Sequence, residues 1–143
     1  MFILQDKIID TAQAKRQASD ISFGALVTFE GVVRNDQHQD TRVSSLMYIA
    51  DSDECIKQGD QIIQEAYKHF SIRKAVCIQR IGQVPAGESA TWIGVWAEHR
   101  DEAFKGCRYI IEETKQRLLI WKKEHFINGT SAWVRKTNTT VNL

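Results

Sequence analysis

Residues 113–126, ETKQRLLIWKKEHF, place three lysines and an arginine around a single tryptophan. Lys115 and Lys122 lie seven residues apart, which is about two turns of an α-helix. A helix that continued through this stretch would hold both amines on one face, where they could bind an anion and act on it. An amine beside apolar residues, as Lys115 is, can serve as an acid, a base or a nucleophile. The alternative is structural, because lysines at the end of a helix complement its dipole and can simply be solvated.

Two other places could also hold an anion. A long apolar stretch ends at His99-Arg100, and a helix is predicted to begin there, so that free backbone N–H groups and a guanidinium would meet. The alternative is that Asp101 caps this helix and that both neighbours lie in solvent. Arg34 directly follows the apolar stretch FEGVV and could present its guanidinium to a ligand, although loop arginines are also common without such a role.

The elements that would position these residues follow from the hydrophobic pattern. It predicts helices over 7–18, 51–70 and 101–119, and strands over 24–33, 43–50, 73–82, 90–99 and 131–137. The first two strands are expected to pair antiparallel across a polar loop. This order predicts an α+β fold with a mainly antiparallel sheet covered by helices, in a single domain over residues 1–143.

Some local details can be predicted as well. Asp51 and Glu54 are spaced as in a capping box, which would begin the second helix at residue 51. Gly31 is a candidate β-bulge in the first strand. The expected apolar stripes consist of Ile56, Ile63, Tyr67 and Phe70 in the second helix, and of Ala103, Phe104, Cys107, Ile110 and Ile111 in the third.

Composition narrows the class of protein. The chain of 143 residues has a formal net charge of +1, and its pI of about 7.7 argues against a nucleic-acid-binding module. Its start resembles no secretory leader, and no apolar run is long enough to span a membrane. Three widely spaced cysteines predict buried, reduced thiols in the cytoplasm. The four histidines show no metal-ligand spacing, and the common nucleotide-binding and nucleophile motifs are absent, so no metal is expected.

A set of motifs, read together, resembles the large, catalytic subunit of molybdopterin synthase. They occur in the same order as in that family, from Gly24 to Trp133: GALVTFEGVVRN (24–35), QRIGQVPAGE (79–88), HRDEAFKGCRYIIEETK (99–115) and IWKKE (120–124). Each motif is short, and the specificity lies in the ordered set.

The resemblance implies a fold, an activity and partners. The fold would be of the α/β hammerhead type. Two copies would form a homodimer that binds two small ubiquitin-like sulfur-carrier subunits, giving a heterotetramer. The carrier's C-terminal thiocarboxylate would transfer two sulfurs in succession to cyclic pyranopterin monophosphate, which makes the dithiolene of molybdopterin for molybdenum cofactor biosynthesis. The chain would be a sulfurtransferase with no cofactor of its own.

The resemblance also assigns roles to individual residues. Lys115 and Lys122 match the family's catalytic lysines, and they would contact the substrate as well. The other expected substrate-binding residues are Val32, Val33, Arg34, His99, Arg100, Lys123 and Glu124. Two questions stay open at this point: whether Lys115 is an acid/base or a covalent nucleophile, and which subunit of the dimer supplies His99 and Arg100.

The chain departs from the family pattern in a few places. Leu119 stands where members commonly have a proline, and it would permit the third helix to run on. Ile49 stands where many members have an acidic residue, and Arg135 is near, but not at, the usual position of a C-terminal arginine. No lysine or arginine of the expected site is missing. An active enzyme is therefore favoured over the alternative, a non-catalytic homologue that binds a ubiquitin-like partner or a phosphorylated small molecule as a scaffold.

Overall fold

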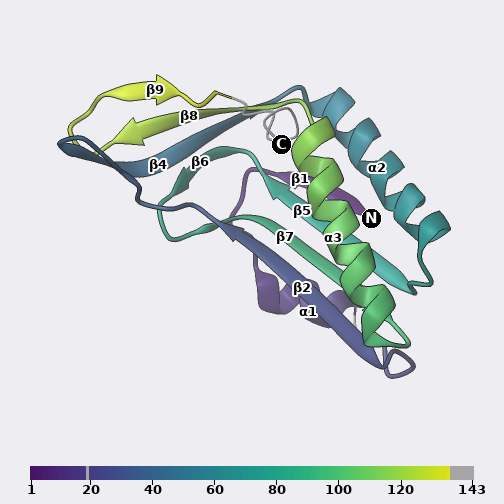
Figure 1. Ribbon diagram of the computed structural model, residues 1–143. Helices are drawn as coiled ribbons and strands as arrows, with labels where there is room; N and C mark the ends of the chain where they lie inside the picture. The colour runs from purple at the N-terminus through teal and green to yellow at the C-terminus, as the bar shows by residue number, and fades with distance from the viewer. Residues whose placement is uncertain (19, 136–143) are drawn as a thin grey trace.

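The computed structural model describes residues 1–18 and 20–135. In this part of the chain, a four-stranded sheet carries helices on both faces, and a second sheet extends away from one end of it (Figure 1). Nearly all strand pairs are antiparallel, so the α+β prediction with a mainly antiparallel sheet is confirmed.

The first sheet has a strongly apolar central strand. Its order is β1 (Phe2–Gln5), β5 (Lys74–Arg80), β7 (Ser89–Ala97) and β2 (Ala25–Val32), and β1 is parallel to β5. Strand β7 is buried along most of its length, as expected for a strand covered on both faces. The register of β2 against β7 shifts between Gly31 and Val32, which confirms the bulge predicted at Gly31.

The second sheet is built around β4 (Thr41–Ala50). This strand pairs with β3 (Gln37–His38) and β6 (Gly82–Pro85), and it pairs with β8 (Ile120–Phe126), which in turn pairs with β9 (Ser131–Trp133). The predicted pairing of strand 24–33 with strand 43–50 is therefore wrong. Strand β4 alternates between buried and exposed residues in its first half, a pattern that suits a sheet with one solvated face, whereas β7 offers β2 a doubly covered neighbour.

Three helices pack on the first sheet in the described residues (Figure 1). Helices α2 (Ser52–His69) and α3 (Arg100–Arg117) cover one face, where the largest fully buried side chains include Ile62, Ile93 and Ile110. Helix α1 (Thr11–Ala18) covers the opposite face over Trp92 and Trp96. The main core thus lies beneath α2 and α3, and it fixes the position of α3 relative to the sheet.

The start of α2 was predicted correctly, whereas its buried face was predicted only in part. Asp51 is the N-cap, and its carboxylate accepts a hydrogen bond from the Glu54 N–H at 3.2 Å. The buried residues of α2 are Cys55, Gly59, Ile62, Ile63 and Ala66. Ile56 lies outside this stripe and is 40% exposed, and Phe104 of α3 is 60% exposed. Both predictions fail because these residues lie one position beyond the face that the sheet covers.

The three cysteines are free and buried, as the sequence predicts. Burial raises the pKa of the Cys55 and Cys107 thiols to about 11 and that of Cys77 to about 12. Because the thiol form then prevails at neutral pH, these cysteines are packing residues and poor nucleophiles.

Candidate active site

A cavity of about 780 Å³ lies where the end of α3 meets the second sheet. Its wall comes from β2 and the loop after it, from β4, from the last turn of α3 and from β8. Apolar side chains, among them Phe29, Leu46 and Ile111, alternate with polar and charged ones around it. A concave space with a few convergent charges is typical of a small-molecule site.

Four cationic side chains from different parts of the chain line this cavity. Arg34 follows β2, Lys115 belongs to the last turns of α3, Lys122 lies on β8, and Arg135 follows β9. The Arg34 guanidinium contacts the Asp36 carboxylate at 3.1 Å, and its side chain is 81% exposed, so it can still turn towards a ligand. The sequence separates Arg34 from the lysines by about eighty residues, and only the fold brings them together. This convergence makes the cavity a candidate anion site.

Lys115 and Lys122 do not share a helical face, because the helix does not continue as far as Lys122. Helix α3 ends at Arg117, and Leu118 is already extended, with φ −70° and ψ 132°. The chain then enters β8 at Ile120. Leu119 therefore does not prolong the helix. The two lysines line one cavity because a helix and a strand border it together.

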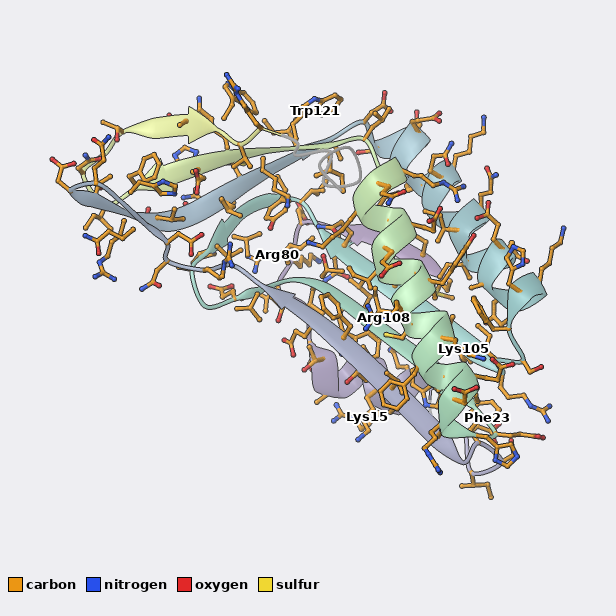
Figure 2. The ribbon with its side chains drawn as sticks, viewed as in Figure 1. Lys15, Phe23, Arg80, Lys105, Arg108 and Trp121 are labelled. Carbon is orange, nitrogen blue, oxygen red and sulfur yellow. The ribbon has the colours of Figure 1, made fainter. Side chains whose placement is uncertain are left out.

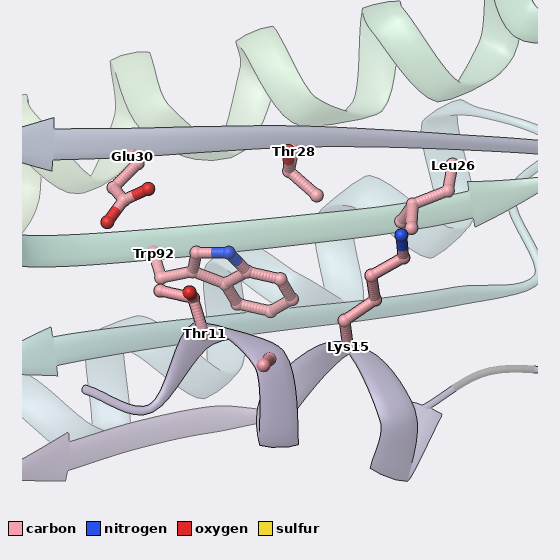
Figure 3. Close-up of a pocket in the computed structure, with 7 residues that line it drawn as sticks. Thr11, Lys15, Leu26, Thr28, Glu30 and Trp92 are labelled. Carbon is pink, nitrogen blue, oxygen red and sulfur yellow. The ribbon is translucent and has the colours of Figure 1, made fainter.

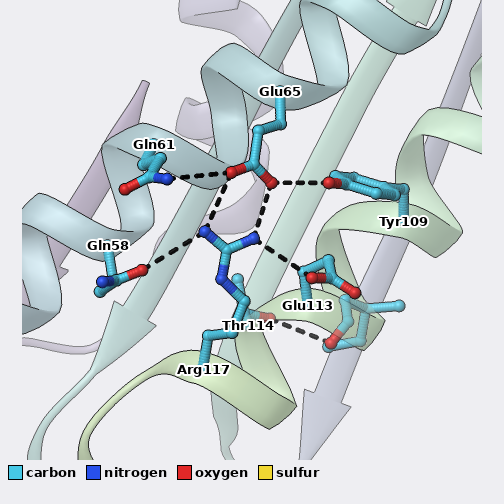
Figure 4. A network of polar contacts seen from close by, with 8 residues as sticks. Gln58, Gln61, Glu65, Tyr109, Glu113, Thr114 and Arg117 are labelled. Carbon is cyan, nitrogen blue, oxygen red and sulfur yellow. Dashed lines mark hydrogen bonds and ion pairs between the residues drawn. The ribbon is translucent and has the colours of Figure 1, made fainter.

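The end of α3 is fixed by a polar network between α2 and α3 (Figure 4). Arg117 donates to both carboxylate oxygens of Glu65, at 2.6 and 3.0 Å, and the Tyr109 hydroxyl donates to one of them at 2.6 Å. These hydrogen bonds, that from Arg117 first, lower the pKa of Glu65 to about 2. Because Arg117 is only two residues beyond Lys115, the network also fixes the position of Lys115 relative to the cavity.

Strand β8 divides its charged residues between two faces. Lys122 and Glu124 line the cavity, as expected for alternate residues of a strand. Lys123 lies between them in sequence, and it places its ammonium 5.2 Å from the ring centroid of Trp133 on β9. Lys123 is not part of the cavity wall. Its predicted contact with the substrate would therefore require a route other than this cavity.

The two valines before Arg34 both belong to the cavity wall. Val33 is almost fully buried and packs with Tyr48 and Val84, whereas Val32 is half exposed. Val33 also fixes the backbone next to the arginine, because its N–H donates to the Glu88 carbonyl at 3.0 Å.

His99 and Arg100 lie at the other end of α3 from Lys115. His99 is the N-cap without a side-chain cap bond, and Arg100 begins the helix. Fifteen residues separate Arg100 from Lys115, which corresponds to about 22 Å along the helix axis. Asp101 does not cap the helix either, since its carboxylate contacts Lys105 in an exposed i,i+4 pair at 3.0 Å. The cavity of one chain therefore contains neither His99 nor Arg100.

The fold adds residues to the cavity that the sequence did not indicate. His38 on β3 contacts the Glu124 carboxylate at 3.3 Å, and Tyr48 on β4 lies beside Lys122. Gln79 and Thr91 are hydrogen bonded to each other at 2.8 Å and also line the wall. Gln79 belongs to the motif QRIGQVPAGE, which did not indicate a role for it, and the other three lie outside the quoted motifs. Tyr48 and Leu46 alternate along a predicted strand.

A second, smaller pocket lies on the opposite face of the first sheet (Figure 3). It has a volume of about 330 Å³ between α1 and β2, and Trp92 lies beneath it between Lys15 and Glu30. It is shallow and contains none of the residues singled out from the sequence, so the larger cavity is the better candidate. No cluster of potential metal ligands occurs within the described ranges, 1–18 and 20–135.

Comparison with known proteins identifies the family. A family model described as MoaE protein matches residues 4–117, which is most of the chain. The chain belongs to the MoaE protein family. The matched segment includes Arg34 and Lys115 and ends just before β8.

MoaE relatives with a curated name support this assignment along most of the chain. The molybdopterin synthase catalytic subunit of Thermoplasma volcanium is 43% identical over 110 residues, covering 77% of this chain and 80% of that protein. The protein of the same name from Oryza sativa subsp. japonica is 36% identical over 121 residues, covering 85% of this chain and 62% of its own length.

Solved MoaE-type structures share the fold. The crystal structure of molybdopterin synthase from Staphylococcus aureus has a TM-score of 0.84 and 30% identity, and the match covers 94% of this chain and 96% of that one. A protein–protein complex of subunits 1 and 2 of the molybdopterin-converting factor from Helicobacter pylori has a TM-score of 0.78 at 18% identity, covering 94% and 90%. The hammerhead-type fold expected from the sequence is thereby confirmed.

No helix among residues 1–18 and 20–135 is long and apolar enough to cross a membrane.

Proposed function

We propose that this MoaE chain is the catalytic subunit of molybdopterin synthase and transfers sulfur to cyclic pyranopterin monophosphate. The observation that carries the proposal is the meeting of Arg34, Lys115 and Lys122 in one cavity. The relatives named as catalytic subunits agree with it. The sulfur donor would be the C-terminal thiocarboxylate of a small ubiquitin-like carrier, and the H. pylori complex of two subunits provides a structural parallel for such a pairing.

The charges of the cavity suit this substrate. Cyclic pyranopterin monophosphate carries a phosphate, and the carrier tail carries a thiocarboxylate, so that two anionic groups must enter together. Arg34 and Lys122 would bind the phosphate and stabilise the charge that appears when its ring is opened by one water molecule. Apolar side chains such as Phe29 and Ile111 offer a surface for the flat pterin.

Each sulfur transfer can be written as two balanced steps. The thiocarboxylate sulfur bonds to a substrate carbon, and the oxygen on that carbon leaves as water after it receives a proton. A second water then cleaves the acyl–sulfur bond, which leaves sulfur on the substrate and a carboxylate on the carrier. Lys115 would move these protons as an acid/base. Covalent attack by its amine is the alternative role.

The reaction so written requires no metal or cofactor held by the chain. We place the protein in the cytoplasm, where its three buried thiols would remain reduced. The apolar surroundings of the thiols argue that they take no part, since sulfur comes from the carrier.

A homodimer would bring His99 and Arg100 to the cavity of the second subunit. Strand β2 is an end strand of the first sheet, and His99 and Arg100 lie near its beginning because Ala25 pairs with Ala97. The cavity is lined by the other end of β2, where Phe29, Gly31 and Val32 lie. Two copies related by a two-fold axis beside β2 would exchange these ends. The exposed Phe104, next to the beginning of α3, offers apolar surface for such a contact.

The decisive experiment is a turnover assay with cyclic pyranopterin monophosphate and a thiocarboxylated carrier. Wild type should form the dithiolene product, and Lys115→Ala should lower kcat by about 10²- to 10⁴-fold. Lys115→Arg keeps the charge but removes a readily titrated amine, so it should be similarly slow. Lys105→Ala is the matched control on the exposed side of α3, and it should behave as wild type.

Absence of product from wild type, with a carrier shown to bind, would overturn the enzyme proposal. Near-normal turnover of Lys115→Arg would instead exclude both the proton-transfer and the nucleophile roles of Lys115 while leaving the enzyme assignment intact.

A further inference from the structure

Tyr48 is a buried polar residue of the cavity wall to which the proposed reaction gives no role. It lies on β4 between β6 and β8, and it is 8% exposed. Leu46, two residues earlier, lines the same cavity, as the alternation of a strand requires. The partner of Tyr48 on the β6 side is Gly82, which has no side chain to cover the ring.

The Tyr48 hydroxyl has no hydrogen-bond partner within residues 1–18 and 20–135. Its pKa is raised by burial, with no contribution from a hydrogen bond. In this part of the chain, the side-chain atoms that are fully enclosed and lack a hydrogen-bond partner belong to Thr41, Arg80 and Glu102. The Tyr48 hydroxyl is not one of these enclosed atoms. The hydroxyl therefore retains access to open space, and the cavity that Tyr48 lines provides it. Buried hydroxyls normally have a partner, so this one is a candidate for contact with a ligand.

Lys122 is the direct neighbour of Tyr48 on the adjacent strand. The two residues are register partners in the β4–β8 ladder, which places their side chains on one face of the sheet. The Lys122 ammonium lies 5.8 Å from the centroid of the Tyr48 ring, within the range of a cation–π contact. The ring thus limits where the ammonium can stand, and the hydroxyl and the ammonium form a pair of donors.

Burial keeps the phenol protonated. It raises the pKa of Tyr48 to about 12, so at neutral pH the hydroxyl is a neutral donor beside a cation. A neutral donor and a cation on one wall suit an anionic oxygen, which can accept from both at once.

We infer that Tyr48 is a further ligand-binding residue of the cavity: its ring positions the Lys122 ammonium, and its hydroxyl donates to the anionic oxygen that Lys122 binds. This inference rests on the proposed function for the identity of the ligand. The anionic oxygen belongs either to the phosphate of the pterin or to the carboxyl end of the carrier tail, and both present the same chemistry to the wall.

The test separates the ring from the hydroxyl. Tyr48→Phe keeps the ring beside Lys122 and removes only the donor, so KM for the ligand should rise about tenfold with kcat nearly unchanged. Tyr48→Leu removes both, and it should lower kcat as well, because the Lys122 ammonium loses its support. Separate titrations identify the source of the oxygen: a rise in KM confined to the pterin assigns the phosphate, and one confined to the carrier assigns the tail.

Tyr67→Phe is the matched control. The Tyr67 hydroxyl accepts a hydrogen bond from the Ala75 N–H at 2.9 Å, between α2 and β5 and away from the cavity. Loss of that bond should lower stability and leave both KM values as in wild type. If Tyr48→Phe keeps the thermal stability of wild type but has an altered KM, its defect lies in ligand binding and is not explained by a loss of stability.

Equilibrium binding makes the outcome independent of turnover. Calorimetric titration of wild type and Tyr48→Phe with the pterin, and with the carrier in its carboxylate form, should show about a tenfold weaker Kd for one of the two. If wild type and Tyr48→Phe have the same Kd for the pterin and the same Kd for the carrier, the inference is overturned. An inactive wild type would overturn the proposed function only, because the binding comparison would still decide the role of Tyr48.

Discussion

Lys122 and Lys123 are adjacent in the sequence, and they lie on opposite faces of β8. Lys122 reaches the cavity beside Tyr48, whereas Lys123 lies over Trp133. Both are lysines in the same motif, so their residue type could not distinguish them. The alternation of a strand does so, once the segment is known to be a strand.

Glu65 shows how a single residue contributes to stability. Arg117 and Tyr109 donate to its carboxylate, and they lower its pKa to about 2 from an ordinary value of 4.5. As the pH falls, this carboxyl takes up a proton near its ordinary pKa in the unfolded chain, and only at a lower pH in the folded chain. Its contribution to stability is therefore fully present above pH 4.5 and is lost as the pH falls towards about 2.

Glu65→Gln should accordingly destabilise the protein at pH 7 and much less in acid. We expect a loss of about 1–2 kcal/mol in the free energy of unfolding at pH 7, because charge-assisted hydrogen bonds of a partly exposed pair are replaced. Denaturant titrations of wild type and variant at pH 7, 4.5 and 3 measure the difference. It should shrink below pH 4.5, and a constant difference would contradict the argument.

Glu112→Gln is the matched control for this prediction. Glu112 pairs with Arg108 on the exposed side of α3 at 3.3 Å, and the two side chains are 58% and 79% exposed. Figure 2 labels Arg108 and Lys105 along this side of the helix. An exposed pair of this kind contributes little, so the change should stay within about 0.5 kcal/mol at every pH.

At the scale of elements, the boundary between α3 and β8 decides the geometry of the site. The helix ends at Arg117 without a proline, and the next residues enter the second sheet, where Trp121 is half exposed and borders the cavity (Figure 2). Two features fix this end: the network of Arg117 with Glu65, and the Leu119 carbonyl, which accepts from the Asp51 N–H at 3.4 Å.

Leu119→Pro should therefore be tolerated. Leu118 already has the extended conformation that a residue before proline prefers, and proline retains the carbonyl that Asp51 uses. The free energy of unfolding should change by no more than about 1 kcal/mol, with any gain coming from a less flexible unfolded chain. Thermal unfolding and turnover measure this, and a clear loss of either would show that the leucine at this position shapes the site.

Glu112→Pro provides the contrast within the same helix. It lies inside α3, where proline removes a backbone hydrogen bond and clashes with the preceding turn. A loss of about 3 kcal/mol or more is expected there.

At the scale of the whole molecule, one chain separates the proposed site residues into two groups. Arg34, Lys115 and Lys122 share a cavity, whereas His99 and Arg100 lie at the far end of α3. If the second group serves the neighbouring subunit, each active site needs both chains of a dimer.

Hybrid dimers test this arrangement. A mixture of Lys115→Ala and Arg100→Ala chains, unfolded and refolded together, should regain about a quarter of wild-type activity, because half of the dimers are hybrids and each hybrid has one intact site. A mixture of Lys115→Ala and Arg34→Ala chains should regain none, because both residues belong to the cavity of one chain. Recovery in the second mixture, or none in the first, would contradict the proposed exchange.

The sequence by itself determined the class of fold and most helices and strands. Period-two and helical patterns over β2, β4, β5 and β7, and over α2 and α3, depend only on which residues avoid water, and local chemistry such as the Asp51 cap marks their ends. The same local information indicated which lysines and arginines to examine. It did not predict the strand over residues 120–126, because their charged residues suit an exposed helix end as well as a strand.

Only the tertiary structure decided which of these residues meet. Strand β8 exists because β4 offers it a partner, and that pairing turns Lys122 and Glu124 into the cavity and Lys123 away from it. The same pairing puts Tyr48 beside Lys122, and the length of α3 keeps His99 and Arg100 away from both. Contacts between residues far apart in the chain depend on strand partners and helix length, and these follow from burying the whole core rather than from any local stretch.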